Sequence, residues 1–235
     1  ALSMDMFSDR VLKPCIAAIA NKVDRDGLVM AKNATANLVG VPGTRPTGAI
    51  TYLTAGALMD AEGTPRDGRR CVVIDPFTSA TIVDSLKGLF VPQTAISQQY
   101  TKGMMGRDSL GVNWKMDQNV VSQTFGSWAT AAGALTVNGA TQGLATGWAA
   151  TSTISLGTTQ TLTLNQGDVI YFAGVQGTNP QNRQSYGQLR AFSVQGTTTS
   201  AAGNFNVTVS PALIYGGQFQ NVTASPAAGA AVTNA

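Results

Sequence analysis

The sequence predicts an α+β chain in which a mixed helix-and-strand part is followed by an antiparallel β part. The first observation is charge: after position 117 the only charged residues are Asp168, Arg183 and Arg190, whereas the preceding part is rich in both signs. The second is periodicity, because apolar residues recur at helical spacing near the N-terminus and at strand spacing in the second part. We therefore expect a domain boundary near Gln118.

A long amphipathic helix is predicted from Ser3 to Asp26. Ser3 is a suitable N-cap, and Pro14 is expected to kink or restart the helix because it lacks a backbone donor. Gly27 is typical of a helix end. Apolar side chains recur at helical spacing in two neighbouring rows: Phe7, Val11, Cys15 and Ala18, and Leu12, Ile16, Ile19 and Val23.

Short helices and strands follow this helix in the first part. Residues 31–46 are rich in Gly, Pro and Asn and are expected to form a loop. The predicted elements after it are, in order, a helix over 47–61, a buried strand over 71–74, helices over 77–86 and 93–101, and a strand over 110–115.

The second part consists of Thr- and Val-rich segments separated by Gly, Asn and Pro, as in a small antiparallel barrel or sandwich. The clearest hairpin has strands at 161–164 and 169–173 and a turn at 165–168. Further strands are predicted at 189–194 and 205–209, the latter ended by Pro211.

Composition excludes much of enzyme chemistry. The chain contains no His, so Ser-His-Asp and Cys-His catalysis and His-ligated metal sites are excluded. Its two cysteines cannot form a Cys-rich zinc site or a disulfide framework, and we expect Cys15 and Cys71 to be buried and reduced. No apolar run of about 18 residues is present to span a membrane, and no secretory signal is visible.

Two motifs resemble catalytic or phosphate-binding signatures and lack essential parts. Residues 106–110 (GRDSL) approach a hydrolase motif, but Arg107 is inserted and no His is available to activate Ser109. Residues 43–48 (GTRPTG) open like a phosphate-binding loop, but Ala49 and Ile50 stand where Lys and Ser or Thr are required. The sequence therefore predicts no catalytic, cofactor-binding or metal-binding residue.

The order of these features resembles that of tailed-bacteriophage major capsid proteins of the podovirus coat type. The segments that carry the resemblance are residues 71–76 (CVVIDP), 103–120 (GMMGRDSLGVNWKMDQNV), 164–175 (LNQGDVIYFAGV) and 204–214 (NFNVTVSPALI). The resemblance implies a capsid core portion over 1–119, with a spine helix and peripheral and axial elements. It also implies an inserted six-stranded antiparallel β-barrel over 120–230 and a tail over 231–235.

Relative to that family pattern, the chain has no arm and loop before the spine helix and no return after the barrel, which predicts a truncated coat subunit. The resemblance implies a structural protein of the virion capsid, without enzyme activity or cofactor. It implies assembly in the bacterial host cytoplasm, as pentamers and hexamers of an icosahedral shell around DNA. A scaffolding protein is a further expected partner.

Three points stay open at the level of sequence. The bases Arg10, Lys13, Lys22 and Arg25 are candidates for non-specific DNA contact, but they alternate with acids, which favours a solvated face. The main alternative function is a phage tail, decoration or adhesin module that binds a glycan or host surface, with Trp114, Trp128 and Trp148 as candidates for a sugar site. A glycosidase is the weaker alternative, because it needs a carboxylate pair that the sequence does not identify.

Overall fold

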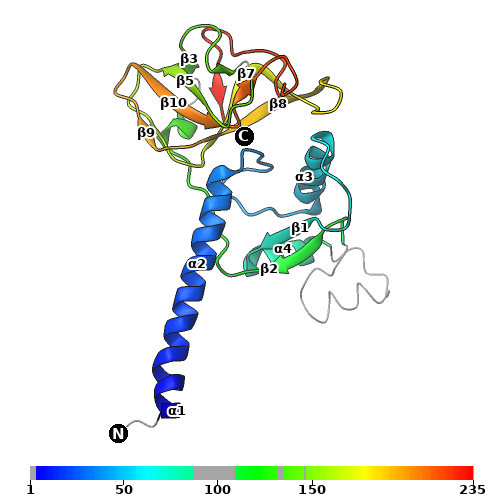
Figure 1. Cartoon of the computed structure of the whole chain (residues 1–235), viewed down its shortest axis with the longest axis vertical. Helices are drawn as coiled ribbons and strands as arrows, with labels where there is room; N and C mark the ends of the chain where they lie inside the picture. Colours follow the sequence, from blue (N-terminus) through cyan, green and yellow to red (C-terminus); the bar gives the residue numbers. More distant parts are fainter. Residues whose placement is uncertain (1–3, 87–108, 132–134, 146, 235) are drawn as a thin grey trace.

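The computed structural model describes residues 4–86, 109–131, 135–145 and 147–234. A long helix leads into the underside of a β-barrel, and a small helix-and-strand unit lies beside the upper part of that helix (Figure 1). The mixed first part and the antiparallel second part expected from the charge break are therefore both present.

The N-terminal helix consists of three consecutive pieces: α1 (Met4–Phe7), a π-helical turn η1 (Ser8–Leu12) and α2 (Lys13–Ala34). Pro14 lies in the first turn of α2, where its missing N–H costs no hydrogen bond, so the predicted restart is confirmed. The predicted end at Gly27 is wrong. The helix continues through Gly27 because helix-compatible residues follow it, and it ends at Thr35, whose backbone is extended.

The unit beside the helix, here called the platform, comprises α3 (Ala49–Ala61), β1 (Cys71–Ile74), α4 (Pro76–Ser85) and β2 (Asn113–Met116). Strands β1 and β2 pair in parallel. A small apolar cluster around Ile74 and Ile82 holds these elements together, and Tyr52 packs edge-on against Trp114 at 4.9 Å between ring centroids. The predicted helices 47–61 and 77–86 and the strand 71–74 are confirmed within two residues, while the helix expected at 93–101 lies outside the described residues.

The second part forms an antiparallel sheet of six strands in the order β12-β7-β8-β10-β5-β3. The strands are β3 (Thr136–Val137), β5 (Ser152–Gly157), β7 (Val169–Thr178), β8 (Ser185–Val194), β10 (Asn204–Ser210) and β12 (Val232–Thr233). Buried and exposed residues alternate along much of β5 and β10, as expected where one face covers a core.

The two edges of this sheet meet, which makes it a barrel. Thr136 of β3 forms an antiparallel bridge with Ala231, and Val232 N donates to the Leu135 carbonyl at 3.0 Å. Closure leaves fewer unpaired edge groups. The barrel therefore extends past residue 230 and includes β12, within the five residues expected to be a tail.

The predicted hairpin at 161–173 is wrong in its pairing. Strand β6 (Thr163–Leu164) pairs with β9 (Thr198–Thr199), while β7 pairs with β8 and β12. The turn at 165–168 is present, but Asp168 accepts a bond from Asn165 N and turns the chain away from a ladder with β6. A further two-stranded sheet joins β4 (Leu144–Ala145) to β11 (Leu213–Ile214) in parallel.

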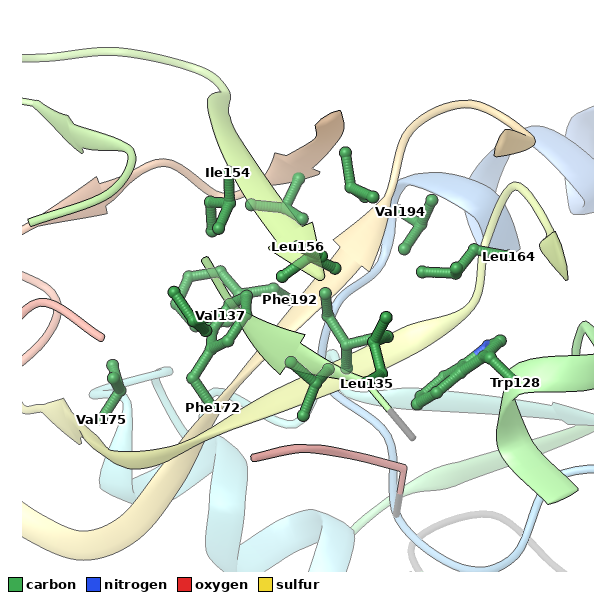
Figure 2. Close-up of a cluster of buried hydrophobic side chains, with 14 of the residues drawn as sticks. Trp128, Leu135, Val137, Ile154, Leu156, Leu164, Phe172, Val175, Phe192 and Val194 are labelled. Carbon is green, nitrogen blue, oxygen red and sulfur yellow. The ribbon is translucent and has the colours of Figure 1, made fainter. Parts of the chain in front are cut away.

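The barrel encloses the larger of the two apolar cores. Phe172 and Phe192 pack at its centre with 5.5 Å between ring centroids, and Leu135, Leu156 and the neighbouring aliphatic side chains surround them (Figure 2). Trp128 closes one edge of this cluster (Figure 2). This core fixes the frame on which the polar groups described below are positioned.

Both cysteines are free thiols, as expected, but both are exposed rather than buried. Cys15 lies on α2, a helix with no buried residue, and Cys71 is the first residue of β1. The sequence pattern placed them on apolar faces correctly, but in these parts of the chain the apolar faces are not covered.

Candidate functional site

Within the described ranges, no group of three or more His, Cys, Asp or Glu residues is placed to hold a metal ion. The first three residues of the GRDSL segment lie outside those ranges. The features described below are exposed surfaces and the polar groups that position them.

The most elaborate polar group surrounds Asp168, a carboxylate with no solvent exposure. Its Oδ2 accepts from Trp128 Nε1 at 2.7 Å, from Asn165 N at 2.8 Å and from Gly126 N at 3.0 Å. Its Oδ1 accepts from Gln123 Nε2 at 2.7 Å. Four donors from segments about 40 residues apart thus converge on one buried charge, which compensates its desolvation.

The hydrogen-bonded residues around Asp168 also connect the barrel to α2. Gln123 Oε1 accepts from Lys32 Nζ near the end of α2, and Ser193 Oγ donates to the Asn33 carbonyl at 2.6 Å. Burial lowers the pKa of Lys32, and the negative charge of Asp168 partly opposes this shift. The fit is tight, because a Cβ added at Gly167 would lie 2.6 Å from Asn33 Oδ1.

The second candidate feature is an apolar stripe along the spine helix. Five large side chains lie on one side of α2 and the turn before it, each 45–71% exposed: Leu12, Ile16, Ile19, Val23 and Met30. At 1.5 Å per residue, the stripe is about 27 Å long. The lower part of the helix stands clear of the platform and the barrel (Figure 1). The stripe is uninterrupted from Leu12 to Val23, and Asp26 and Gly27 separate Val23 from Met30 on the same face. An exposed apolar row of this kind is typical of a surface that another protein segment covers.

None of the helices in the described part of the chain combines the length and apolar character needed to cross a bilayer.

The tryptophans considered for glycan binding do not share one environment. Trp128 is 3% exposed and belongs to the barrel core, and Trp114 is half-buried in the platform against Tyr52. Trp148 is 74% exposed. Because Trp128 is buried, it cannot contribute to the exposed aromatic surface that glycan binding requires.

Two of the four basic residues considered for DNA contact form ion pairs with acids on the same helix. Lys13 pairs with Asp9 at 2.5 Å and Lys22 with Asp26 at 2.9 Å, each one helical turn apart. These pairs are as expected for a solvated helix face.

The basic loop after α3 is organised around one acid. Arg66 and Arg70 both donate to Asp60, and these hydrogen bonds hold the pKa of that carboxyl below its usual value. Arg69, beside Asp67, is largely exposed.

The groups that sequence reasoning missed are Asp168, Gln123 and the pair of Glu62 with Arg190. The sequence pattern places Asp168 in a turn and Arg190 in a strand, but it does not indicate which residues form hydrogen bonds or ion pairs with them. The available signal was their isolation, because Asp168, Arg183 and Arg190 are the only charged residues in an otherwise neutral half. A charged residue in such surroundings is a candidate for a specific partner.

Comparison with known proteins bears on the whole chain. Residues 3–234 match the family described as P22 coat protein, gene protein 5. Among solved structures, the chain is similar to the CUS-3 coat protein I-domain, with 25% identity, coverage of 43% of this chain and 93% of that chain, and a TM-score of 0.33. The comparison with curated proteins finds no match. Because the family match extends over nearly every residue, the chain belongs to the P22 coat protein family and is a structural protein of a phage capsid.

Proposed function

We propose that copies of this chain assemble into the capsid shell through contacts that cover the apolar stripe on α2. The observation that carries the proposal is the stripe itself: five large apolar side chains remain 45–71% exposed on a helix with no buried residue. Removing one such side chain from water contributes roughly 1.5–3 kcal/mol. Covering several of them supplies enough free energy for many weak, repeated contacts.

The charge pattern supports repeated self-contact. The barrel carries three charged residues, so neighbouring copies of it experience little mutual repulsion. Near the stripe, Lys13 pairs with Asp9 and Lys22 pairs with Asp26, each within the N-terminal helix. Contacts of this kind depend mainly on apolar burial and little on salt.

The finer parts of the proposal concern geometry and partners. Pentamers and hexamers of an icosahedral shell, assembly in the bacterial host cytoplasm and a scaffolding protein as partner are supported by family membership alone. Non-specific contact with enclosed DNA is supported by the exposed bases Arg10 and Arg25. The division into a capsid core portion and an inserted barrel is supported by the two separate apolar cores.

The test is sedimentation of a variant with Ile16→Ser and Ile19→Ser, which removes the centre of the stripe without disturbing any buried residue. We expect self-association to weaken by at least about tenfold per substitution. The matched control carries Ala17→Ser and Asn21→Ser on the opposite side of the same helix, and should assemble like the wild type. Equal assembly of both variants, or a wild-type chain that stays monomeric at all concentrations, would contradict the proposal.

A further inference from the structure

The barrel holds its few charges mostly where it meets the rest of the molecule. Of its three charged residues, Asp168 and Arg190 both belong to contacts with α2 or the platform. Arg183 lies in the turn between β7 and β8. Charges that merely kept the barrel in solution would be spread over its outer surface.

The second of these contacts joins the barrel to the end of α3. Arg190 Nη1, on β8, donates to Glu62 Oε1, directly after α3, and the two side chains are 14% and 19% exposed. Asn37 Nδ2 donates to the other carboxylate oxygen of Glu62 at 2.8 Å. Beside this pair, Asn179 Nδ2 donates to the Ala61 carbonyl at 3.1 Å. Figure 1 shows α3 reaching toward the barrel near β8.

These contacts lie between two apolar cores that share no residue. The barrel core is built from residues 125–232, and the platform core from residues 52–114. The chain passes from one to the other once, through residues 117–126, which form neither helix nor strand. Polar contacts therefore contribute to the arrangement of barrel and platform, and such contacts require a defined geometry.

We propose that Glu62 and Arg190 form a clasp that sets the angle of the barrel relative to α2, with the Lys32–Gln123–Asp168 chain as the pivot. Opening the clasp lets the barrel turn about residues 117–122, which precede Gln123, while both apolar cores stay folded. In a shell subunit such a device allows identical chains to present the barrel at different angles. The proposal concerns the single chain and does not depend on the assembly surface proposed above.

The clasp is tested by distance measurement between two spin labels in the whole chain. One label occupies the native exposed Cys15 on α2, and the other an introduced cysteine at the exposed barrel residue Ala201, with Cys71→Ser to avoid a third label. The wild type should give one narrow distance distribution. Charge reversal by Glu62→Arg or by Arg190→Glu places like charges together, and the fraction of molecules outside the wild-type peak should rise about tenfold.

The exchanged pair, with both reversals in one chain, should restore the narrow peak because it recreates the ion pair in the opposite direction. Asp67→Arg, a reversal at a half-exposed acid of the neighbouring loop, is the matched control and should leave the distance unchanged. Tryptophan emission, measured with Trp114→Phe and Trp148→Phe in the background so that only Trp128 emits, reports whether the barrel stays folded. Should a reversal unfold the chain, Glu62→Gln removes the charge with the same shape and should broaden the peak. Unchanged distances in the single variants, or an exchanged pair as displaced as they are, would overturn the clasp.

Discussion

At the scale of single residues, Asp168 organises the end of the barrel. Its carboxylate has no exposure and receives donors from Gln123, Gly126, Trp128 and Asn165. A buried carboxylate is stable only when its oxygens accept hydrogen bonds. Loss of one donor leaves an oxygen without its hydrogen bond, and the cost of removing that oxygen from water then lowers the stability of the fold. The surrounding loops are therefore fixed by one side chain.

Trp128→Phe tests this dependence, since it removes the Nε1 donor while an aromatic ring remains, although the smaller ring also leaves part of the indole volume empty. We expect the free energy of unfolding of the barrel to fall by about 1–3 kcal/mol. Trp148→Phe, at a largely exposed position, is the control and should change stability by less than about 0.5 kcal/mol. Urea unfolding followed by circular dichroism measures both, and equal effects of the two substitutions would refute the role of the indole donor.

Tyr52 provides a prediction about pH. Burial, and to a smaller extent the negative charge of Asp75, raise the pKa of Tyr52 to about 12. Because the unfolded chain ionises near 10, the stabilising effect is complete below pH 10 and is lost as pH rises from 10 to 12. Absorbance titration should show one tyrosine with a midpoint near 12 that disappears in Tyr52→Phe. A midpoint near 10 for that residue would show that the ring is not buried as described.

At the scale of elements, α2 shows where local sequence reasoning succeeds and where it fails. The apolar rows and the effect of Pro14 follow from spacing and from proline chemistry. The end of the helix does not, because a single Gly costs only about 1 kcal/mol and favourable neighbours outweigh it. Similarly, the sequence predicted strands in the regions of β7, β8 and β10 but none at β3, β5 or β12. It also paired β6 with the wrong neighbour, since pairing depends on residues far away in the chain.

Two glycine substitutions should have opposite effects on stability. Gly27→Ala meets no atom within 4 Å in the middle of α2 and should stabilise the helix by up to about 1 kcal/mol. Gly167→Ala places a Cβ 2.6 Å from Asn33 Oδ1 at a backbone φ of +86° and should destabilise the chain by about 1–3 kcal/mol. Thermal unfolding at 222 nm measures both. If Gly167→Ala were neutral, α2 and the barrel would not be in the tight contact described.

At the scale of the whole molecule, the drop in charged residues near Gln118 predicted a mixed helix-and-strand part followed by an antiparallel β part. The structure contains both kinds of fold in that order. The closure of the barrel by residues 230–233 was not predictable from local pattern: an Ala-rich segment has weak strand propensity, and it pairs only because β3 and β7 leave open edges beside it. The polar contacts between the parts were missed for the same reason, since their partners are up to 160 residues apart.

We expect the apolar stripe of α2 to be buried against neighbouring protein in the assembled shell. Electron cryomicroscopy of particles formed by the protein tests it directly. We expect density from an adjacent subunit in contact with Ile16, Ile19 and Val23. A shell in which this face of α2 borders solvent along its length would contradict it.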